Sequence, residues 1–132
     1  MINRINALVL VVRDVEKCAL FYRDKLGFNL DQLERDEAYL TVGSGGGIVL
    51  ALKSLDLAAK QISPERIRPR EESVKRNHCV VFVTDVDAEY SDLSRKGVHF
   101  LSPPKTLPDG WRTAHFDDPD ENLWELAQRP TV

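Results

Sequence analysis

Hydrophobic and polar positions follow the same order twice along this chain. Two short apolar runs, one near the N-terminus and one in the middle, each lead to an aspartate, Asp14 or Asp85. After each aspartate, apolar residues recur every three or four positions, which predicts a helix with one apolar face. A short carboxylate can accept the free amide hydrogens of a first helical turn, and glycine readily adopts a left-handed backbone. We therefore expect Asp14 and Asp85 to cap the helices and Gly27 and Gly97 to end them.

Three strand-like runs follow each predicted helix. They are 28–33, 38–42 and 48–52 in the first half, and 98–101, 111–116 and 123–127 in the second. Each half is therefore a βαβββ module. One helix cannot cover both faces of a four-stranded sheet, so two modules must pair, within one chain or by exchange between two chains. The predicted fold is α+β, with two βαβββ modules forming a curved mixed β-sheet around a cleft and the helices outside.

A charged segment separates the two modules. The expected boundaries are 1–53 for the first module, 54–76 for the linker and 77–132 for the second module. The linker opens with a possible short helix over 55–61, and Pro64 and Pro69 exclude regular structure after it. An exposed linker is favoured over a lid that touches an anionic ligand through Arg66, Arg68 or Arg70.

Composition narrows the function classes. A formal charge of −3 argues against a nucleic-acid partner, because such binding depends on neutralising phosphates. The apolar run 7–12 is too short for a membrane span or the core of a signal peptide, which predicts a cytoplasmic protein with no membrane partner. Cys18 and Cys79 lack metal-type spacing and sit within apolar runs, so we expect buried free thiols.

Two motifs resemble the vicinal oxygen chelate superfamily of glyoxalases, bleomycin-resistance proteins and extradiol dioxygenases. They are Phe-Tyr-Arg-Asp-Lys-Leu-Gly-Phe at 21–28 and Asp-Pro-Asp-Glu-Asn-Leu-Trp-Glu-Leu at 118–126. The resemblance covers nearly the whole chain and is specific for the fold. It is not specific for one function, since this scaffold hosts several kinds of enzyme as well as drug-binding proteins. It implies a small-molecule ligand and a homodimer.

The resemblance also implies where a metal would bind. Metal-dependent relatives hold one divalent ion, such as Fe, Mn, Zn or Ni, with His and Glu from the first and last strands of the modules. His78 and Glu125 occupy those positions in the second module, whereas Ala7 and Leu50 occupy them in the first. Neither Ala7 nor Leu50 can donate a lone pair, and two protein ligands alone would hold an ion weakly. Both a bound metal and no metal therefore stay open.

The turn before the last strand predicts a third member of this group. The segment 118–121 suits a type I turn followed by a left-handed residue. A hairpin with this turn places His115 directly opposite Glu125, with His78 reaching in from a separate strand. Glu121 would occupy the left-handed position, at a cost on the order of 1 kcal/mol.

These three side chains allow three interpretations. They form a two-His, one-carboxylate metal set, with His115 and Glu125 as catalytic groups. Alternatively, His78 is a pocket residue hydrogen-bonded to Glu125 with no metal, which the missing first-module ligands favour. The least favoured reading is a general acid–base couple without metal.

The expected ligand pocket has one apolar wall from the first module, set against polar residues of the second. Its lining is Ala7, Val9, Val11, Leu50, Phe82, Trp111 and Thr113. Trp111 would stack on a planar ligand or else pack on the linker. Arg112 has the opposite parity and should face outward or towards the helix. His99 is expected on the surface, and Trp124 in the core against a helix.

The first functional hypothesis is a small-molecule binder, resembling drug-sequestering resistance proteins, for an aromatic or amphiphilic ligand. The alternative is a metal-dependent enzyme, a glyoxalase-like lyase or an extradiol-dioxygenase-like oxygenase, that uses His78 and Glu125. In that enzyme His115 completes the ligand set or acts as a base. Whether the protein is an enzyme stays open. A thiol transferase is the least favoured function, because it needs both the metal and a cationic phosphonate pocket.

Overall fold

The chain forms two compact units, Met1–Glu72 and Ser73–Val132. The computed structural model describes residues 1–44, 47–69 and 77–131. Each unit contains a four-stranded mixed sheet with helices, so the predicted α+β fold with a repeated βαβββ order is confirmed. Arg70, one of the candidate lid residues, lies outside the described residues.

The first unit follows the predicted element order. Its elements are β1 (Ala7–Val12), α1 (Val15–Asp24), β2 (Asn29–Leu33), β3 (Glu37–Thr41), β4 (Val49–Ser54) and α2 (Leu55–Gln61). The strand order is β1-β4-β3-β2, with β1 parallel to β4 and the other pairs antiparallel. Helix α2 packs on β4 and β1 and buries Ala58, so this part of the expected linker is built into the first unit.

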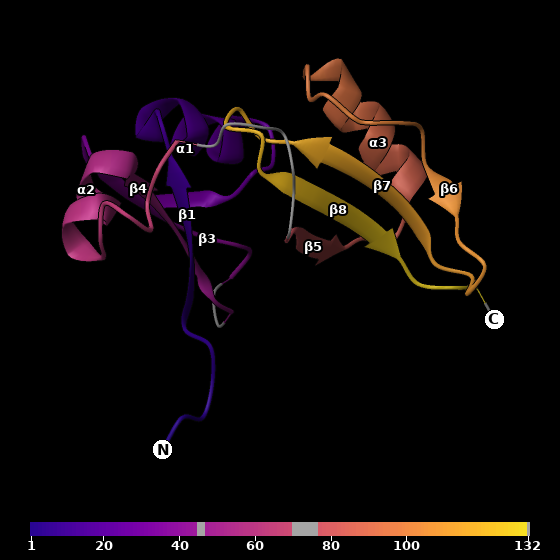
Figure 1. Cartoon of the computed structure of the whole chain (residues 1–132). Helices are drawn as coiled ribbons and strands as arrows, with labels where there is room; N and C mark the ends of the chain where they lie inside the picture. The colour runs from indigo at the N-terminus through magenta and orange to yellow at the C-terminus, as the bar shows by residue number, and fades with distance from the viewer. Residues whose placement is uncertain (45–46, 70–76, 132) are drawn as a thin grey trace. The chain divides into compact units, whose positions relative to one another are not determined.

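The second unit repeats the first. Its elements are β5 (Cys79–Phe82), α3 (Val86–Arg95), β6 (Lys105–Thr106), β7 (Arg112–Asp117) and β8 (Leu123–Gln128). The strand order is β5-β8-β7-β6, again with the first and last strands parallel. Figure 1 shows α3 running along the β7–β8 pair, which leaves the opposite face of the sheet free of this helix.

Capping residues set the limits of the two long helices, as predicted. The carboxylate of Asp14 accepts the amide hydrogen of Lys17, and that of Asp85 accepts the amide hydrogen of Ala88. Gly27 and Gly97 have φ values of 74° and 88°, the left-handed backbone that ends each helix. The same local chemistry therefore starts and stops the helix in both modules.

One predicted strand is wrong. The segment 98–101 forms only a single bridge, Phe100 to Phe116, and the edge strand β6 comes later, at Lys105–Thr106. Pro103 and Pro104 lie between the two, and proline has no amide hydrogen to donate to a strand ladder. The prolines thus divide the edge of this sheet into two short pieces.

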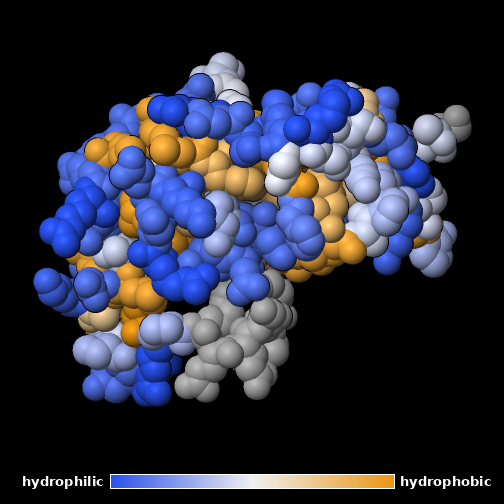
Figure 2. Space-filling view, turned by 90° about the horizontal axis from the view of Figure 1, so that it is seen from above, coloured by the Kyte–Doolittle hydropathy of each residue, from blue (hydrophilic) through white to orange (hydrophobic). Residues whose placement is uncertain are grey.

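Each unit has its own apolar core between helix and sheet. In the first unit Tyr22 of α1 is fully buried and its ring stacks on that of Phe28, with centroids 5.8 Å apart. In the second unit Trp124 stacks on Phe116 at 6.3 Å, which confirms its predicted place in the core. On the face seen in Figure 2, hydrophilic residues dominate and hydrophobic residues show between them.

The two cysteines are free thiols, as expected. Cys18 is buried, whereas Cys79 is only partly buried. Burial, with a smaller contribution from Asp118, raises the pKa of the Cys79 thiol, which keeps it protonated at neutral pH.

In the described part of the chain, no helix combines the length and the apolar character needed to cross a bilayer.

Asp118 organises the turn between β7 and β8. Its carboxylate accepts hydrogen bonds from the backbone amides of Asp120 and Asn122, at 2.8 and 2.9 Å, and from the Asn122 side chain at 2.8 Å. The Asp118 amide donates to the Asn122 carbonyl at 3.0 Å. Glu121 has a φ of 64°, so the predicted turn with a left-handed residue at this position is confirmed.

This turn generates a stability prediction. A side chain at a left-handed position brings Cβ close to the following carbonyl, a strain that glycine avoids. We expect Glu121→Gly to be more stable than Glu121→Ala by about 1 kcal/mol in the free energy of unfolding, measured by urea denaturation. Glu121→Ala is the matched control, because both variants lack the carboxylate and only one keeps Cβ. Equal stabilities would contradict a strained backbone here.

Candidate ligand-binding site

The face of the second sheet that α3 does not cover carries the candidate site. Strand pairing sets the rows across it: Val80 pairs with Glu125, and Glu125 with His115. The next row joins Phe82, Ala127 and Thr113 in the same way. Since paired residues share a face, the side chains of both rows point to one side of the sheet. The predicted register of His115 opposite Glu125 is confirmed.

His78, His115 and Glu125 form a compact cluster. The Nε2 atom of His115 lies 2.7 Å from Oε1 of Glu125, and Nε2 of His78 lies 3.5 Å from the same oxygen. The two imidazole rings are 6.0 Å apart. The side chains of His78, His115 and Glu125 are 42%, 28% and 19% exposed, so water or a ligand can reach them. One oxygen of Glu125 thus joins both histidines.

The donor set of this cluster is chemically suited to a divalent cation. One possible ligand atom from each side chain lies within 4.8 Å of the other two. Two neutral imidazole nitrogens and one carboxylate are ligands that Zn, Ni, Mn and Fe accept, and a facial set of three leaves positions for substrate oxygens. The same atoms also satisfy one another, because a protonated imidazole nitrogen can donate to Glu125.

A cavity of about 270 Å³ adjoins the cluster. It is lined by Phe82, Leu107, Asp109, Trp111, Thr113, Glu125 and Ala127. Phe82, Trp111 and Thr113 were predicted as pocket residues, and the structure brings them together with Glu125. Sequence reasoning missed Leu107, Asp109 and Ala127. The alternation along β8 could have suggested Ala127, since it lies two residues after Glu125.

A tight loop forms the rim of the cavity. The amide of Leu107 donates to the carbonyl of Trp111 at 2.7 Å, and the amide of Gly110 donates to the carbonyl of Leu107 at 2.9 Å. The carboxylate of Asp109 accepts the amide hydrogen of Trp111 at 3.1 Å. Gly110 has a φ of 94°, and a Cβ there would come within 3.0 Å of Pro130. Glycine therefore allows the loop to close against the C-terminal segment.

Aromatic rings and an arginine gather beside this loop. The Phe82 and Trp111 rings lie 5.2 Å apart at 46°, and Phe82 is 62% exposed. The guanidinium carbon of Arg129 lies 5.1 Å from the Phe82 ring centre and 5.8 Å from that of Trp111. Trp111 thus packs on Phe82 and Arg129 while it lines the cavity. No periodicity of the sequence had indicated Arg129.

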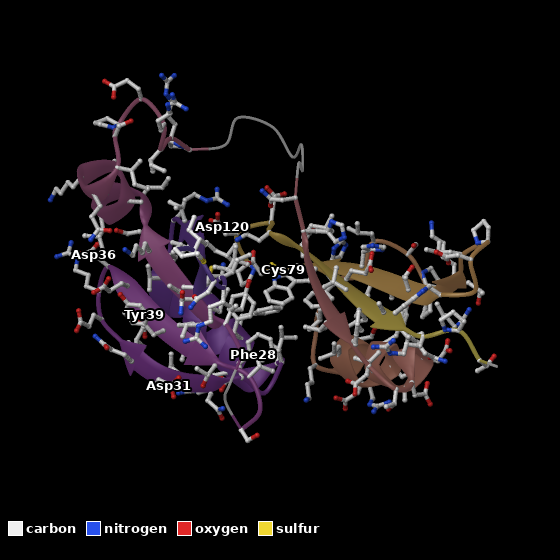
Figure 3. The ribbon with its side chains drawn as sticks, turned by 90° about the horizontal axis from the view of Figure 1, so that it is seen from below. Phe28, Asp31, Asp36, Tyr39, Cys79 and Asp120 are labelled. Carbon is white, nitrogen blue, oxygen red and sulfur yellow. The ribbon has the colours of Figure 1, made fainter. Side chains whose placement is uncertain are left out.

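The first unit carries no equivalent cluster in the same register. Val9 pairs with Ala51, as Val80 pairs with Glu125, so the position equivalent to Glu125 holds Ala51 and not Leu50. Tyr39 pairs with Ala51 and stands where the second unit has His115. The hydroxyl of Tyr39, a residue labelled in Figure 3, donates to Glu37 at 3.0 Å. This hydrogen bond raises the pKa of Tyr39.

The expected apolar wall of the first unit is divided between two faces. Leu50 pairs with Leu8, whereas Val9 pairs with Ala51, so Leu50 lies on the opposite face of the sheet from the residues at the odd positions of β1. Those residues, Ala7, Val9 and Val11, share one face as predicted. All four belong to the first unit, outside the lining of the cavity described above.

Arg112 and His99 lie where the sequence analysis predicts. Arg112 turns to α3 and binds Asp87 through two contacts of 2.8 Å, which lower the pKa of the Asp87 carboxyl. His99 is exposed. Cys79, labelled in Figure 3, is the first residue of β5 and pairs with Trp124, so its side chain has the opposite parity from that of Glu125 in the cluster.

Comparisons with known proteins agree with this fold. A family model described as "Glyoxalase/Bleomycin resistance protein/Dioxygenase superfamily" matches residues 4–126. The chain is 34% identical over 119 residues to the uncharacterized protein YraH of Bacillus subtilis (strain 168), a match that covers 89% of this chain and 91% of YraH.

Solved structures show the same architecture. A glyoxalase/bleomycin resistance protein/dioxygenase from Nocardioides is 27% identical, with a TM-score of 0.83 over 98% of this chain and 87% of its own. A lactoylglutathione lyase from Agrobacterium tumefaciens shares the fold at 20% identity, with a TM-score of 0.73 over 96% and 93% of the two chains. From the family match and its coverage, the chain belongs to the glyoxalase/bleomycin resistance protein/dioxygenase superfamily.

Proposed function

We propose that the protein binds a small aromatic or amphiphilic molecule in the cavity of its second unit, without using a metal. A drug-sequestering role is one such function. The observation that carries the proposal is the lining of the 270 Å³ cavity, in which Phe82 and Trp111 meet apolar side chains at one end and Glu125 lies at the other. Small-molecule sites typically combine an apolar lining with a few polar groups that orient the ligand.

The exposure of Phe82 supports an aromatic ligand. A phenylalanine that is 62% exposed leaves apolar area in contact with water, and Val80 on the same strand and face is 44% exposed. Covering such area contributes about 25 cal/mol for each Å² removed from water. A planar molecule resting on Phe82 and Trp111 would gain this energy together with favourable ring contacts.

The residues at the equivalent positions of the first unit support binding without a metal. Ala7, Tyr39 and Ala51 stand where the second unit has His78, His115 and Glu125. None of the three offers an imidazole or a carboxylate, so any ion would depend on the second unit's cluster. There Glu125 already forms a hydrogen bond with His115 and a 3.5 Å contact with His78.

A neutral aromatic probe tests this proposal. We expect 2-naphthol to bind the purified protein in a one-to-one complex and to raise its melting temperature, because the ligand binds the folded state alone. Phe82→Ala should weaken binding about tenfold, as expected for the loss of one large apolar contact. Isothermal titration calorimetry measures the affinity.

Leu101→Ala is the matched control for that variant. Leu101 is also an exposed apolar residue of the second unit, at 55%, but does not line the cavity. Its replacement should leave the 2-naphthol affinity unchanged. Equal losses in both variants, or no binding to the unmodified protein, would overturn a ligand site at Phe82.

A metal-dependent enzyme, a lyase or a dioxygenase, is the second candidate function. The close approach of His78, His115 and Glu125, with possible ligand atoms within 4.8 Å, favours it. A divalent ion held by these three residues would act as a Lewis acid on substrate oxygens. His115 would then present Nε2 to the ion in place of its contact with Glu125. The cavity would hold the apolar part of the substrate beside the aromatic pair.

A metal assay separates the two functions. For a metal-independent binder, we expect protein purified without chelator to contain far less than one equivalent of Fe, Mn, Zn or Ni, and EDTA to leave 2-naphthol binding unchanged. Elemental analysis and calorimetry measure these quantities. Stoichiometric metal that is lost in His78→Ala and kept in His99→Ala would instead establish the enzyme site. His99 is a suitable control because it is exposed and outside the cluster.

A further inference from the structure

We propose that Arg129 makes the cavity selective for planar aromatic molecules that carry a carboxylate. This inference rests on the proposed ligand-binding function and names the chemical class of the ligand. The observation behind it is the position of the Arg129 guanidinium, which lies over the rings of Phe82 and Trp111, two residues that line the cavity.

Strand register places Arg129 on the face of the cavity. Arg112 pairs with Gln128, the last residue of β8, and Trp111 and Arg129 directly adjoin this pair. Continuing the side-chain alternation of β8 by one residue gives Arg129 the same parity as Ala127 and Glu125, in agreement with its contacts to Phe82 and Trp111. Both of these residues line the cavity. Arg129 therefore extends the cavity face by one further row, past Phe82 and Thr113.

The charge of Arg129 is not matched by a nearby acid. No carboxylate in residues 1–44, 47–69 and 77–131 forms an ion pair with it, whereas Arg95 and Arg112 of the same unit pair with Asp92 and Asp87. A cation–π contact with an aromatic ring uses none of the N–H donors of a guanidinium as hydrogen bonds, so these donors stay available. Those groups match the two oxygens of a carboxylate, which they can bind in a bidentate manner.

Two acidic residues, Glu125 and Asp109, line the cavity, and each already accepts a contact from the protein. Glu125 on β8 lies four residues before Arg129, which directly follows the strand, and four residues of extended chain span about 13 Å. Its Oε1 is already held by His115 and His78. Asp109 uses one oxygen to accept the amide hydrogen of Trp111. A ligand with its carboxylate at Arg129 and its uncharged end towards Glu125 keeps its charge apart from that of Glu125.

The cavity has room for a ligand of about two fused rings, since its volume is about 270 Å³. The ring system of the ligand would cover Phe82 and Trp111 next to Arg129. The aromatic pair supplies apolar contact, and the guanidinium selects the charge and the orientation.

Two probes of nearly equal shape test the selectivity. 2-Naphthoate carries the carboxylate, and 2-naphthamide replaces it with a neutral amide of similar size. We expect the full chain to bind the naphthoate at least about tenfold more tightly than the amide at pH 7.5, measured by isothermal titration calorimetry. Arg129→Met keeps an unbranched side chain without the charge, and should remove most of this difference by weakening naphthoate alone.

Two further variants control for folding and for general charge. Arg129→Lys keeps the positive charge but not the bidentate edge, and should retain part of the preference. Arg95→Met removes a positive charge from α3, where Arg95 pairs with Asp92 away from the cavity, and should change neither affinity. Each variant is compared with the unmodified protein by its melting temperature.

The outcomes separate this inference from the proposed function. Equal affinity for the two probes, or a naphthoate affinity that survives Arg129→Met, overturns the role of Arg129. If 2-naphthol still binds through Phe82 in that case, the ligand-binding function stands without it. If none of the three aromatic probes binds, both proposals are overturned. A preference for naphthoate that Arg129→Met abolishes supports both.

Discussion

The register of the β7–β8 hairpin is the constraint on which the candidate site depends, and the Asp118 carboxylate fixes it. Three hydrogen bonds from Asp120 and Asn122 end on this one side chain, which is almost completely buried. The turn that they hold places His115 opposite Glu125. A shift by one residue would send Glu125 to the face that packs on α3, where Trp124 and Leu126 now lie. The positions of the cluster, of the cavity lining and of Arg129 all depend on this register.

The repeated module explains how the chain carries the cluster in one unit. Both units use the same strand order, the same aspartate caps and the same parallel pairing of first and last strands. The shared backbone therefore provides equivalent positions in both sheets, and the side chains at those positions determine their chemistry. Ala7, Tyr39 and Ala51 offer no pair of imidazoles around a carboxylate, whereas His78, His115 and Glu125 do. A common backbone thus carries different chemistry in its two halves.

Local sequence rules predicted the parts of this protein that local interactions determine. The caps at Asp14 and Asp85 depend on bonds within one helical turn, and the pairing of His115 with Glu125 depends on a four-residue turn. Both were predicted correctly for that reason. The equivalent of Glu125 in the first unit was misplaced by one residue, at Leu50 instead of Ala51. Its pairing with β1 joins distant segments, and nothing nearby in the sequence sets that register.

The cavity rim could not be predicted in the same way. Leu107 and Asp109 belong to a loop whose shape depends on hydrogen bonds to Trp111 and on the contact between Gly110 and Pro130. Such loops have no periodicity from which side-chain direction can be read. The strand expected over 98–101 failed for a related reason. Its apolar residues fitted a strand, but Pro103 and Pro104 prevented a continuous ladder beyond it.

The two ends of the cavity contribute differently to any ligand that binds there. At the polar end, a ligand atom must compete with the 2.7 Å contact between His115 and Glu125, so the net gain from a new hydrogen bond is about 1 kcal/mol. At the aromatic end, each Å² of apolar surface that a ligand covers on Phe82 and Trp111 contributes about 25 cal/mol, and the ligand shares these rings with the guanidinium of Arg129. The aromatic end thus supplies the apolar contact for the ligand. The charged groups, Arg129 on one side and the cluster on the other, determine which molecule is accepted and in which direction it lies.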